Sequence, residues 1–303
     1  MTARELAIQP PAPAAQRDRR DAILAARVAA TRAAARAGVS IRQLEGIAEM
    51  KRVAHLFQAI WGKSDELGPP INSDLLRALA HAGNYVAGAF DATGAMQSAL
   101  VSFLGGPQGA VHVHSHILGV VPGNQARGAG FALKLDQRAW SLAQGYDSME
   151  WTFDPLVRRN AYFNLTKLRS DINDYLVNFY GAMEDGQNGS DDSDRLLVHW
   201  DLLSDAVEAA AAGTPAEPLA AGERATFTAL LTVGEKGQPV TGQHGGGGVL
   251  LQVPADIVRM RIEAPDVAVQ WRLALRRAMV ELLDGGHRCA GVTRDGEYVF
   301  HAR

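Results

Sequence analysis

The chain has 303 residues, of which 47% are hydrophobic and 21% charged, with a formal net charge of −3 and one cysteine, Cys289. This length allows one large domain or two modest ones, and the charge gives no reason to expect nucleic acid or an anionic membrane as a partner. A lone cysteine excludes a disulfide framework within the chain and suits the cytoplasm, and no apolar run approaches the roughly 20 residues of a membrane span.

The first third of the chain is predicted to be mainly helical. Residues 1–20, rich in Pro, Ala and Arg, lack the apolar core of a secretory signal and are predicted to form a disordered tail. An alanine-rich helix is expected at 20–37 and a short strand at 41–44. Apolar residues at helical spacing predict a helix at 47–61, and Ser73 is expected to cap another helix that ends near residue 83.

The hydrophobic pattern then changes to that of strands. Strands are predicted at 84–92, 95–106 and 111–121, with a hairpin turn at 92–94. They are followed by a helix at 131–145, a strand at 148–155, a helix at 156–168 and two closing strands at 171–181 and 195–202. The acidic segment at 184–194 joins the two closing strands, and we interpret it as a solvated connection.

The remaining third is predicted to be a smaller unit. Residues 205–223 are the best boundary candidate. Beyond them we expect strands at 225–233 and 249–254 around a Gly-rich turn, a long helix at 264–286 and a terminal hairpin within 287–300. The order predicts a mixed α/β fold. Its predicted parts are an N-terminal extension at 1–39, a first domain at 40–203 and a C-terminal α/β domain at 204–303.

The segment VHVHSHILGVVPGNQARGAG, residues 111–130, leads from a strand into a helix through small residues. Small residues let an anion approach the first N–H groups of a helix, which carry the positive end of its dipole. Glycines alone are equally consistent with a structural turn. The segment lacks the G-x-G-x-x-G and Gly-Lys-Ser/Thr nucleotide motifs. It does fit Q/R-x-x-G-x-G/A, with Gln125, Gly128 and Gly130.

This pattern resembles the coenzyme A pyrophosphate motif of the GNAT superfamily of N-acyltransferases. The runs SHILGV, WTFDPL, RNAYFN, NFYG and SDRLLVHW together resemble a bacterial branch of predicted acyltransferases, some of which are similar to amino-acid N-succinyltransferases. The resemblance covers about residues 40–203 well and the last third loosely. It implies a GNAT-like α/β fold with an appended C-terminal domain. The sequence departs at KLRSD, where the superfamily usually has Lys-Leu-Gly, so the turn there is expected to differ.

The resemblance also implies ligands and the residues that bind them. The co-substrate would be acetyl-CoA or succinyl-CoA, and the acceptor a small-molecule amine. Backbone groups at Val120 and Val121 would hold the pantetheine arm, and Asn160 would lie beside the acyl arm. Arg127 and Lys134 would meet phosphate charge, or are ordinary charges on a helix surface. The pyrophosphate would lie on Gln125, Ala126, Arg127, Gly128, Ala129 and Gly130.

Acyl transfer needs a base for the amine and benefits from an acid for the leaving thiolate. Tyr162 is the candidate acid, because it lies one turn before Leu165, the place where superfamily members often have a tyrosine. His116 and Asp154 are the candidate bases or substrate contacts, although Asp154 could equally cap the following helix. Direct attack on the acyl group is expected, because Cys289 lies far along the chain from the motif.

Two readings from other classes stay open at this point. His112, His114 and His116 alternate on one strand, as in some metal sites, but no further ligand cluster stands out and we predict no metal. The absence of tyrosine at position 165 and the extra C-terminal third are also compatible with a non-catalytic coenzyme A-binding regulatory protein. The last third is expected to cover the acceptor pocket or to form a homodimer contact.

Overall fold

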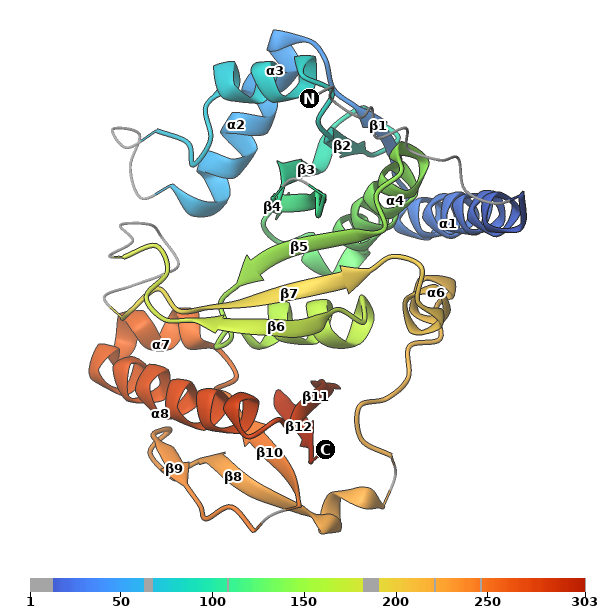
Figure 1. Cartoon of the computed structure of the whole chain (residues 1–303). Helices are drawn as coiled ribbons and strands as arrows, with labels where there is room; N and C mark the ends of the chain where they lie inside the picture. Colours follow the sequence, from blue (N-terminus) through green and yellow to red (C-terminus); the bar gives the residue numbers. More distant parts are fainter. Residues whose placement is uncertain are drawn as a thin grey trace, which may run out of the picture.

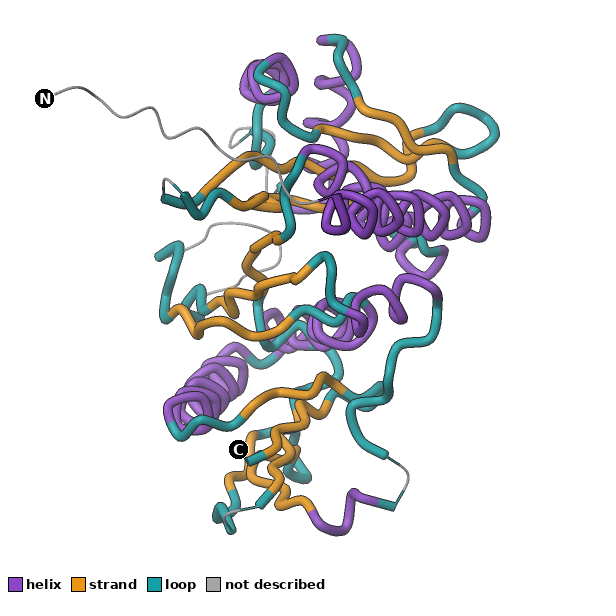
Figure 2. Tube along the Cα trace, turned by 45° about the vertical axis from the view of Figure 1, so that its right-hand side comes forward, coloured by secondary structure: helices purple, strands orange, loops and turns teal. Residues whose placement is uncertain are grey.

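The structure is a computed structural model that describes residues 13–62, 68–107, 109–181, 191–220, 222–245 and 247–302. The described strands form two sheets, with orders β1-β2-β3-β4-β5-β7-β6 and β11-β12-β10-β8-β9 (Figure 1). Helices pack on the larger sheet and also between the two sheets (Figure 2). The predicted mixed α/β class with an additional C-terminal sheet is therefore confirmed.

The larger sheet contains the strands predicted between residues 41 and 202, together with their hairpin turn at 92–94. Its strands are β1 (Ser40–Gln43), β2 (Val86–Phe90), β3 (Met96–Gly105), β4 (His112–Val120), β5 (Ser148–Phe153), β6 (Asp171–Leu176) and β7 (Arg195–Asp201). All neighbouring pairs are antiparallel except β4 and β5, which are parallel. That single parallel pair lies in the middle of the sheet.

Helices cover both faces of the first strands of this sheet. They are α1 (Pro13–Ala37), α2 (Ile47–Trp61), α3 (Ser73–His81), α4 (Ala129–Gln144) and α5 (Arg158–Ala161), which continues into a π-helix at Tyr162–Lys167. Because side chains alternate along a strand, Val86 and Phe90 pack with α2 and α3, whereas Ala87 and Ala89 pack with α4. Helix α1 starts at Pro13, so residues 13–20 of the predicted tail are helical.

Helix α4 is covered on two sides. One side packs on the sheet, and α1 lies along another, where the two helices are adjacent in Figures 1 and 2. Ala26, Ala30 and Ala33 of α1 are buried in this contact, because alanine lets two helices approach closely. Most positions of α4 are therefore buried, including several polar ones.

The C-terminal third forms the smaller sheet and three helices. Its elements are α6 (Asp205–Ala212), β8 (Phe227–Val233), β9 (Pro239–Thr241), β10 (Gly248–Gln252), α7 (Ile257–Glu263), α8 (Pro265–Asp284), β11 (Arg288–Val292) and β12 (Glu297–His301). The predicted long helix and terminal hairpin are present. Strand β9 and helix α7 were not predicted, and the linker expected at 205–223 begins with a helix.

The two sheets share one hydrophobic core. Trp151 and Trp200 of the larger sheet lie in the same buried cluster as Trp271 and Tyr298 of the C-terminal third. Polar contacts join the two parts as well, since the Tyr298 hydroxyl donates to the Pro155 carbonyl at 2.7 Å. This packing places α7 and α8 against the end of β5 and the segment before β7 (Figure 1).

The turn after the π-helix keeps a conformation suited to glycine although glycine is absent. Arg169 has φ of +60°, in the left-handed region that non-glycine residues rarely adopt. Its guanidinium donates to the Ala290 carbonyl of β11 at 2.6 Å. We infer that this anchor to the C-terminal sheet offsets the backbone cost.

Of the described helices, none combines the length and apolarity that crossing a membrane requires.

Candidate active site

The site lies where β4 and β5 separate. These parallel strands pair only at Val113 with Met149 and at His114 with Glu150. His116 is an extra residue in β4, because Ser115 faces Ser102 while Ile117 faces Val101. Such a bulge bends the strand that carries it. The bend fits the loss of pairing beyond His114.

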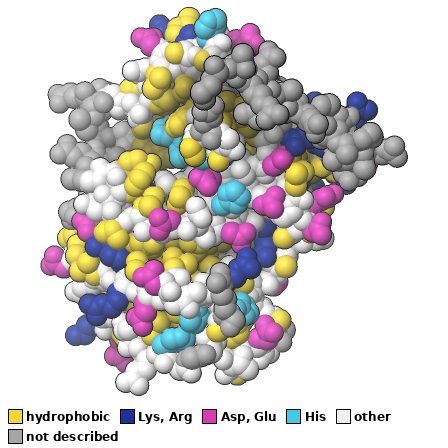
Figure 3. Space-filling model, viewed as in Figure 1, with side chains coloured by type: hydrophobic (Ala, Val, Ile, Leu, Met, Phe, Trp, Pro, Cys, Tyr) yellow, Lys and Arg dark blue, Asp and Glu magenta, His cyan; other side chains and the backbone are white. Residues whose placement is uncertain are grey.

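A cavity of about 230 Å³ occupies this region. Strands β4 and β5 form two of its walls, with Ser115, His116, Ile117 and Leu118 from β4 and Trp151, Thr152 and Phe153 from β5. The other lining residues come from the surrounding helices, from β7 and from the segment after β5: Trp61, Lys134, Asp154, Val157, Asn160, Phe163, Asn164, Arg195 and Arg261. Figure 3 shows hydrophobic and histidine side chains next to each other at the level of β3 to β5, and further ones lower on the same face. The lining is therefore mixed, with apolar walls and several ionisable groups.

Lys134 of α4 is buried beneath this cavity and only 2% exposed. Its ammonium donates to the Ser115 hydroxyl at 2.9 Å and to the Gln137 side-chain oxygen at 3.1 Å. It also lies 3.6 Å from the centre of the Trp151 ring. Burial lowers the pKa of Lys134 well below its usual range. The interpretation of Lys134 as a charge on the helix surface is wrong, because its side chain is buried against Ser115 of β4 and Trp151 of β5. Its contact with phosphate stays a prediction.

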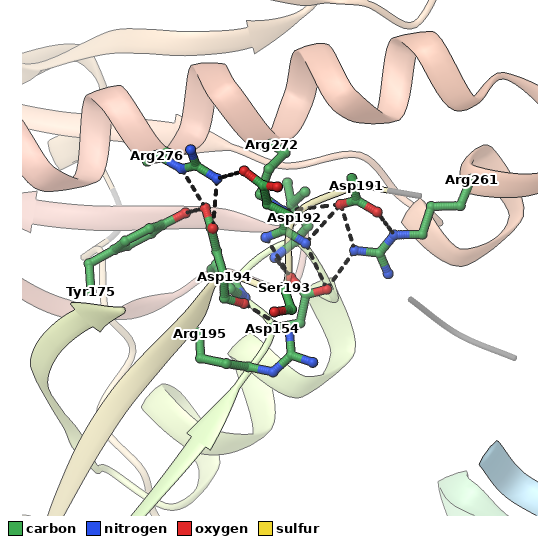
Figure 4. A network of polar contacts seen from close by, with 12 residues as sticks. Asp154, Tyr175, Asp191, Asp192, Ser193, Asp194, Arg195, Arg261, Arg272 and Arg276 are labelled. Atoms are coloured by element: carbon green, nitrogen blue, oxygen red, sulfur yellow. Dashed lines mark hydrogen bonds and ion pairs between the residues drawn. The ribbon is translucent and has the colours of Figure 1, made fainter. Parts of the chain in front are cut away.

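The carboxylate of Asp154 belongs to a buried ion cluster (Figure 4). It contacts Arg261 at 2.6 Å and Arg272 at 3.0 Å, and both arginines also contact Asp191, at 2.8 and 2.9 Å. Burial alone would raise the pKa of Asp154, but Arg272 and Arg261 outweigh it and hold that pKa well below its usual range. Asp154 also accepts from the backbone N–H of Leu156 at 2.9 Å, but it does not cap the following helix, because the N-cap of α5 is Val157 and no side chain caps it.

The ion cluster continues along helix α8. Arg276 contacts Asp194 and Asp192, both at 2.7 Å, and the Tyr175 hydroxyl donates to Asp194 at 2.6 Å. Burial, together with Asp194, raises the pKa of Tyr175. The interpretation of the acidic segment as a solvated connection is therefore wrong for the part that is described. Its residues Asp191 and Asp194 are buried anchors of the C-terminal third.

Each glycine at the start of α4 has a local structural reason. Gly128 has φ of +89° and serves as the N-cap of α4, where it offers no side chain to the first N–H groups. A Cβ on Gly130 would lie 3.1 Å from a methyl carbon of Val120, so glycine lets the helix approach β4. By contrast, α3, α6 and α7 are capped by the side chains of Asn72, Ser204 and Asp256.

Some predicted residues line the cavity and others do not. His116 and Asn160 do, and His116 is exposed. Tyr162 does not, because the cavity meets the helix at Val157, Asn160, Phe163 and Asn164. The Tyr162 ring instead lies 5.7 Å from the Arg294 guanidinium, toward the C-terminal sheet.

The residues of the predicted pyrophosphate site lie at one end of the cavity-lining strand. Val120 ends β4, and Val121 follows it. Gln125, Ala126 and Arg127 form a single 3-10 turn before Gly128, Ala129 and Gly130, and Arg127 is exposed. The structure thus keeps these residues together, next to the uncapped end of α4.

The alternating histidines are not grouped with further metal-ligand side chains in the described part of the chain. Among the described residues, no three or more His, Cys, Asp or Glu side chains are grouped as a metal ion requires. His112 and His199 instead each approach Glu150 at 3.4 Å. Burial, followed by the nearby His116 and His112, lowers the pKa of His114 to about 4.

Several residues of this region belong to no recognisable sequence motif. Trp61, Arg195 and Arg261 line the cavity, and Arg272 lies behind it. Arg195 is buried, donates to the Asp194 carbonyl at 2.9 Å and lies over the Tyr180 ring. These residues come from α2, β7, α7 and α8, so only the fold brings them together.

No protein-family model and no curated protein matches the sequence. Among solved structures, the chain is similar to the ribosomal-protein-S18-alanine N-acetyltransferase from Escherichia coli, with 12% identity, 54% of this chain and 94% of that chain covered, and a TM-score of 0.43. It is similar to the GNAT superfamily phosphinothricin acetyltransferase from Sinorhizobium meliloti, solved with acetyl-CoA, with 14% identity, 59% and 94% covered, and a TM-score of 0.45. An N-acetyltransferase from Staphylococcus aureus Mu50 aligns with 12% identity, 54% and 98% covered, and a TM-score of 0.42.

Proposed function

We propose that the protein is an N-acyltransferase that moves an acetyl or succinyl group from acyl-coenzyme A to the amine of a small molecule, such as an amino acid. The observation that carries this proposal is the cavity between the separated strands β4 and β5, beside the uncapped start of α4. A strand edge and a helix N-terminus are complementary to the two halves of coenzyme A.

The pantetheine arm would lie along β4. Beyond His114, β4 has no pairing with β5 among the described residues, so backbone groups from Ser115 to Val120 face the gap. Pantetheine carries two amides, and an extended chain with amides can add to such an edge as a strand does. A backbone N–H of β4 would then stabilise the thioester oxygen as charge develops on it.

The pyrophosphate would lie at the start of α4. Gly128 leaves the first helical N–H groups without a side-chain cap, and these groups favour an anion. Arg127 is exposed beside them. We therefore keep Gln125 to Gly130 as the proposed pyrophosphate site, without Lys134.

Transfer is proposed to occur by direct attack of the amine on the thioester carbon. Burial raises the pKa of Cys289 to about 12, so this thiol is a poor nucleophile for an acyl-enzyme. Arg195 and Arg261 line the cavity, and their guanidinium groups favour a ligand with a carboxylate. Both a succinyl group and an amino acid carry one. Cytoplasmic location, absence of a metal and a homodimer remain predictions from the sequence.

Calorimetric titration with acetyl-CoA and succinyl-CoA tests the cofactor site. We expect saturable one-to-one binding of at least one donor. Arg127→Glu should weaken it by roughly tenfold or more, because a phosphate contact becomes a repulsion worth above about 1.4 kcal/mol. Lys51→Glu is the matched control: it makes the same charge change at an exposed position of α2 and should leave affinity unchanged. No binding of either donor by the wild type would contradict the proposal.

Release of the coenzyme A thiol in the presence of single amino acids tests the transfer reaction. We expect release that depends on both donor and acceptor, with the acylated amine found by mass spectrometry. Donor binding without transfer to any amine would instead favour the second candidate, a coenzyme A-binding regulatory protein.

A further inference from the structure

Lys134 and the ion cluster differ in how their buried charges are compensated. Among the described residues, no carboxylate lies within 4 Å of the Lys134 ammonium. Its neighbours are a hydroxyl, an amide oxygen and an indole ring, all of which are neutral. An uncompensated charge at this depth is costly, so a lysine here readily gives up its proton.

The neighbours of Lys134 fix its amine in one place. Ser115 also donates to the Gln137 side-chain oxygen at 3.2 Å, so hydroxyl, amide and amine form a closed triangle. Both partners are themselves buried, and Trp151 closes the side toward β5. An amine held this rigidly at the wall of a cavity is preorganised for a ligand group that enters the cavity.

The other ionisable groups of the cavity are less suited to accept a proton. Asp154 is held as a carboxylate by two arginines, and both Arg195 and Arg261 are cationic. Proton uptake by Asp154 would break a buried ion pair, which costs several kcal/mol. His116 also lines the cavity, and burial lowers its pKa, so its imidazole is a weaker base than that of an ordinary histidine.

We propose that Lys134 is the general base of the transfer reaction, with the nitrogen of the attacking amine within hydrogen-bond reach of its Nζ atom. This inference rests on the proposed acyltransferase function and deepens it by naming the group that handles the proton. Ser115, Gln137 and Trp151 act as positioning residues.

Lys134 alone can accept and return the proton that is transferred in the reaction. The neutral amine nitrogen forms a bond to the thioester carbon, and the resulting adduct gives one N–H proton to neutral Lys134. The C–S bond then breaks, and its electron pair leaves with sulfur as the coenzyme A thiolate. The Lys134 ammonium returns the proton to the thiolate, which yields the amide, the free thiol and neutral lysine.

Substitution of Lys134 by methionine tests the kinetic consequence. Lys134→Met keeps the length and the apolar contact with Trp151, so coenzyme A affinity by calorimetry should stay within about threefold, while kcat falls roughly 10²–10⁴-fold. Lys134→Arg should also lose turnover, because arginine cannot give up its proton. Lys167→Met removes an exposed lysine and is the control. Turnover by Lys134→Met within about threefold of wild type would overturn the inference.

Lysine titration by NMR provides a readout that is independent of the acceptor. The chain has only five lysines, namely Lys51, Lys63, Lys134, Lys167 and Lys236. In protein labelled with ¹³C at the lysine Cε, the resonance missing from Lys134→Met should titrate well below the exposed Lys51, Lys167 and Lys236, which serve as internal references. Titration of Lys134 together with these references would overturn the inference.

The two proposals fail in different ways. If the wild type neither binds nor turns over any acyl-coenzyme A, the proposed function fails, whatever the titration of Lys134. If the wild type is active and Lys134→Met is equally active, only the role of Lys134 fails.

Discussion

Arg261 and Arg272 on one side, and Lys134 on the other, are buried cationic residues at or behind the same cavity. They differ in whether carboxylates compensate their charge. Arg261 and Arg272 are 7% and 1% exposed, and each contacts both Asp154 and Asp191 (Figure 4). Lys134 is 2% exposed and contacts only neutral groups. The burial is similar, and the difference lies in the counter-charge.

This difference in counter-charge distinguishes residues that stabilise the fold from a residue that can exchange a proton. A buried guanidinium with two carboxylates remains ionised and joins three segments that lie far apart in the chain. A buried amine without a carboxylate is poised to exchange its proton, as active-site groups are. We infer that the arginine cluster holds α7 and α8 on the larger sheet, whereas Lys134 takes part in the proposed reaction.

Removal of an arginine from the cluster should have the largest effect on stability. Arg272→Met leaves Asp154 and Asp191 buried with reduced compensation, and we expect the free energy of unfolding to fall by about 3–5 kcal/mol. Urea denaturation measures this loss. Arg259→Met removes an exposed ion pair with Glu263 and should change stability by less than about 1 kcal/mol. If both variants lower the free energy of unfolding by similarly small amounts, the buried cluster does not stabilise the fold more than an exposed ion pair does.

Removal of Lys134 should change the pH dependence of stability rather than abolish folding. The pKa of Lys134 is lower in the folded state than in the unfolded chain, so the unfolded chain binds more protons in the window between the two values. Wild-type stability contributed by this group therefore rises with pH across that window, by up to about 1.4 kcal/mol per pH unit. In Lys134→Met this slope should be missing. Urea denaturation at several pH values measures the free energy of unfolding of both proteins. If it changes with pH equally in both, the pKa of Lys134 is not lowered in the folded state.

The smallest effect is expected at Tyr162. Its ring lies beside Arg294 and outside the cavity lining, so we expect Tyr162→Phe to keep turnover within about twofold of the wild type. This differs from the role that the family resemblance implies. A large loss of kcat with normal donor affinity would restore Tyr162 as the acid for the leaving thiolate.

Local patterns predicted most of the fold. The helix at 47–61 matches α2 because its apolar residues follow the helical period, and the terminal hairpin was evident from Asp295-Gly296. The short β9 and α7 were missed, because three to seven residues carry too little periodicity. Residues 1–12 and 182–190, which include parts of the predicted tail and loop, lie outside the described residues.

The candidate site was only partly predictable. The glycines of the segment 122–130 predicted a loop before a helix. The positive φ of Gly123 and Gly128 and the close packing of Gly130 explain why glycine stands at these positions. The burial of Lys134 could not be inferred, because it depends on how α4 packs on β4 and β5, where Ser115 and Trp151 contact the ammonium. The ion cluster was missed for the same reason, since Asp154 and Asp191 meet arginines that follow them by 70 residues or more.

A crystal structure of the protein with acetyl-coenzyme A would show whether the thioester lies beside Lys134. We expect the pantetheine arm to lie between β4 and β5, with its thioester carbon within about 6 Å of the Lys134 Nζ atom, a distance that leaves room for one amine nitrogen between them. Coenzyme A bound elsewhere, or a thioester carbon well beyond that reach, would contradict it.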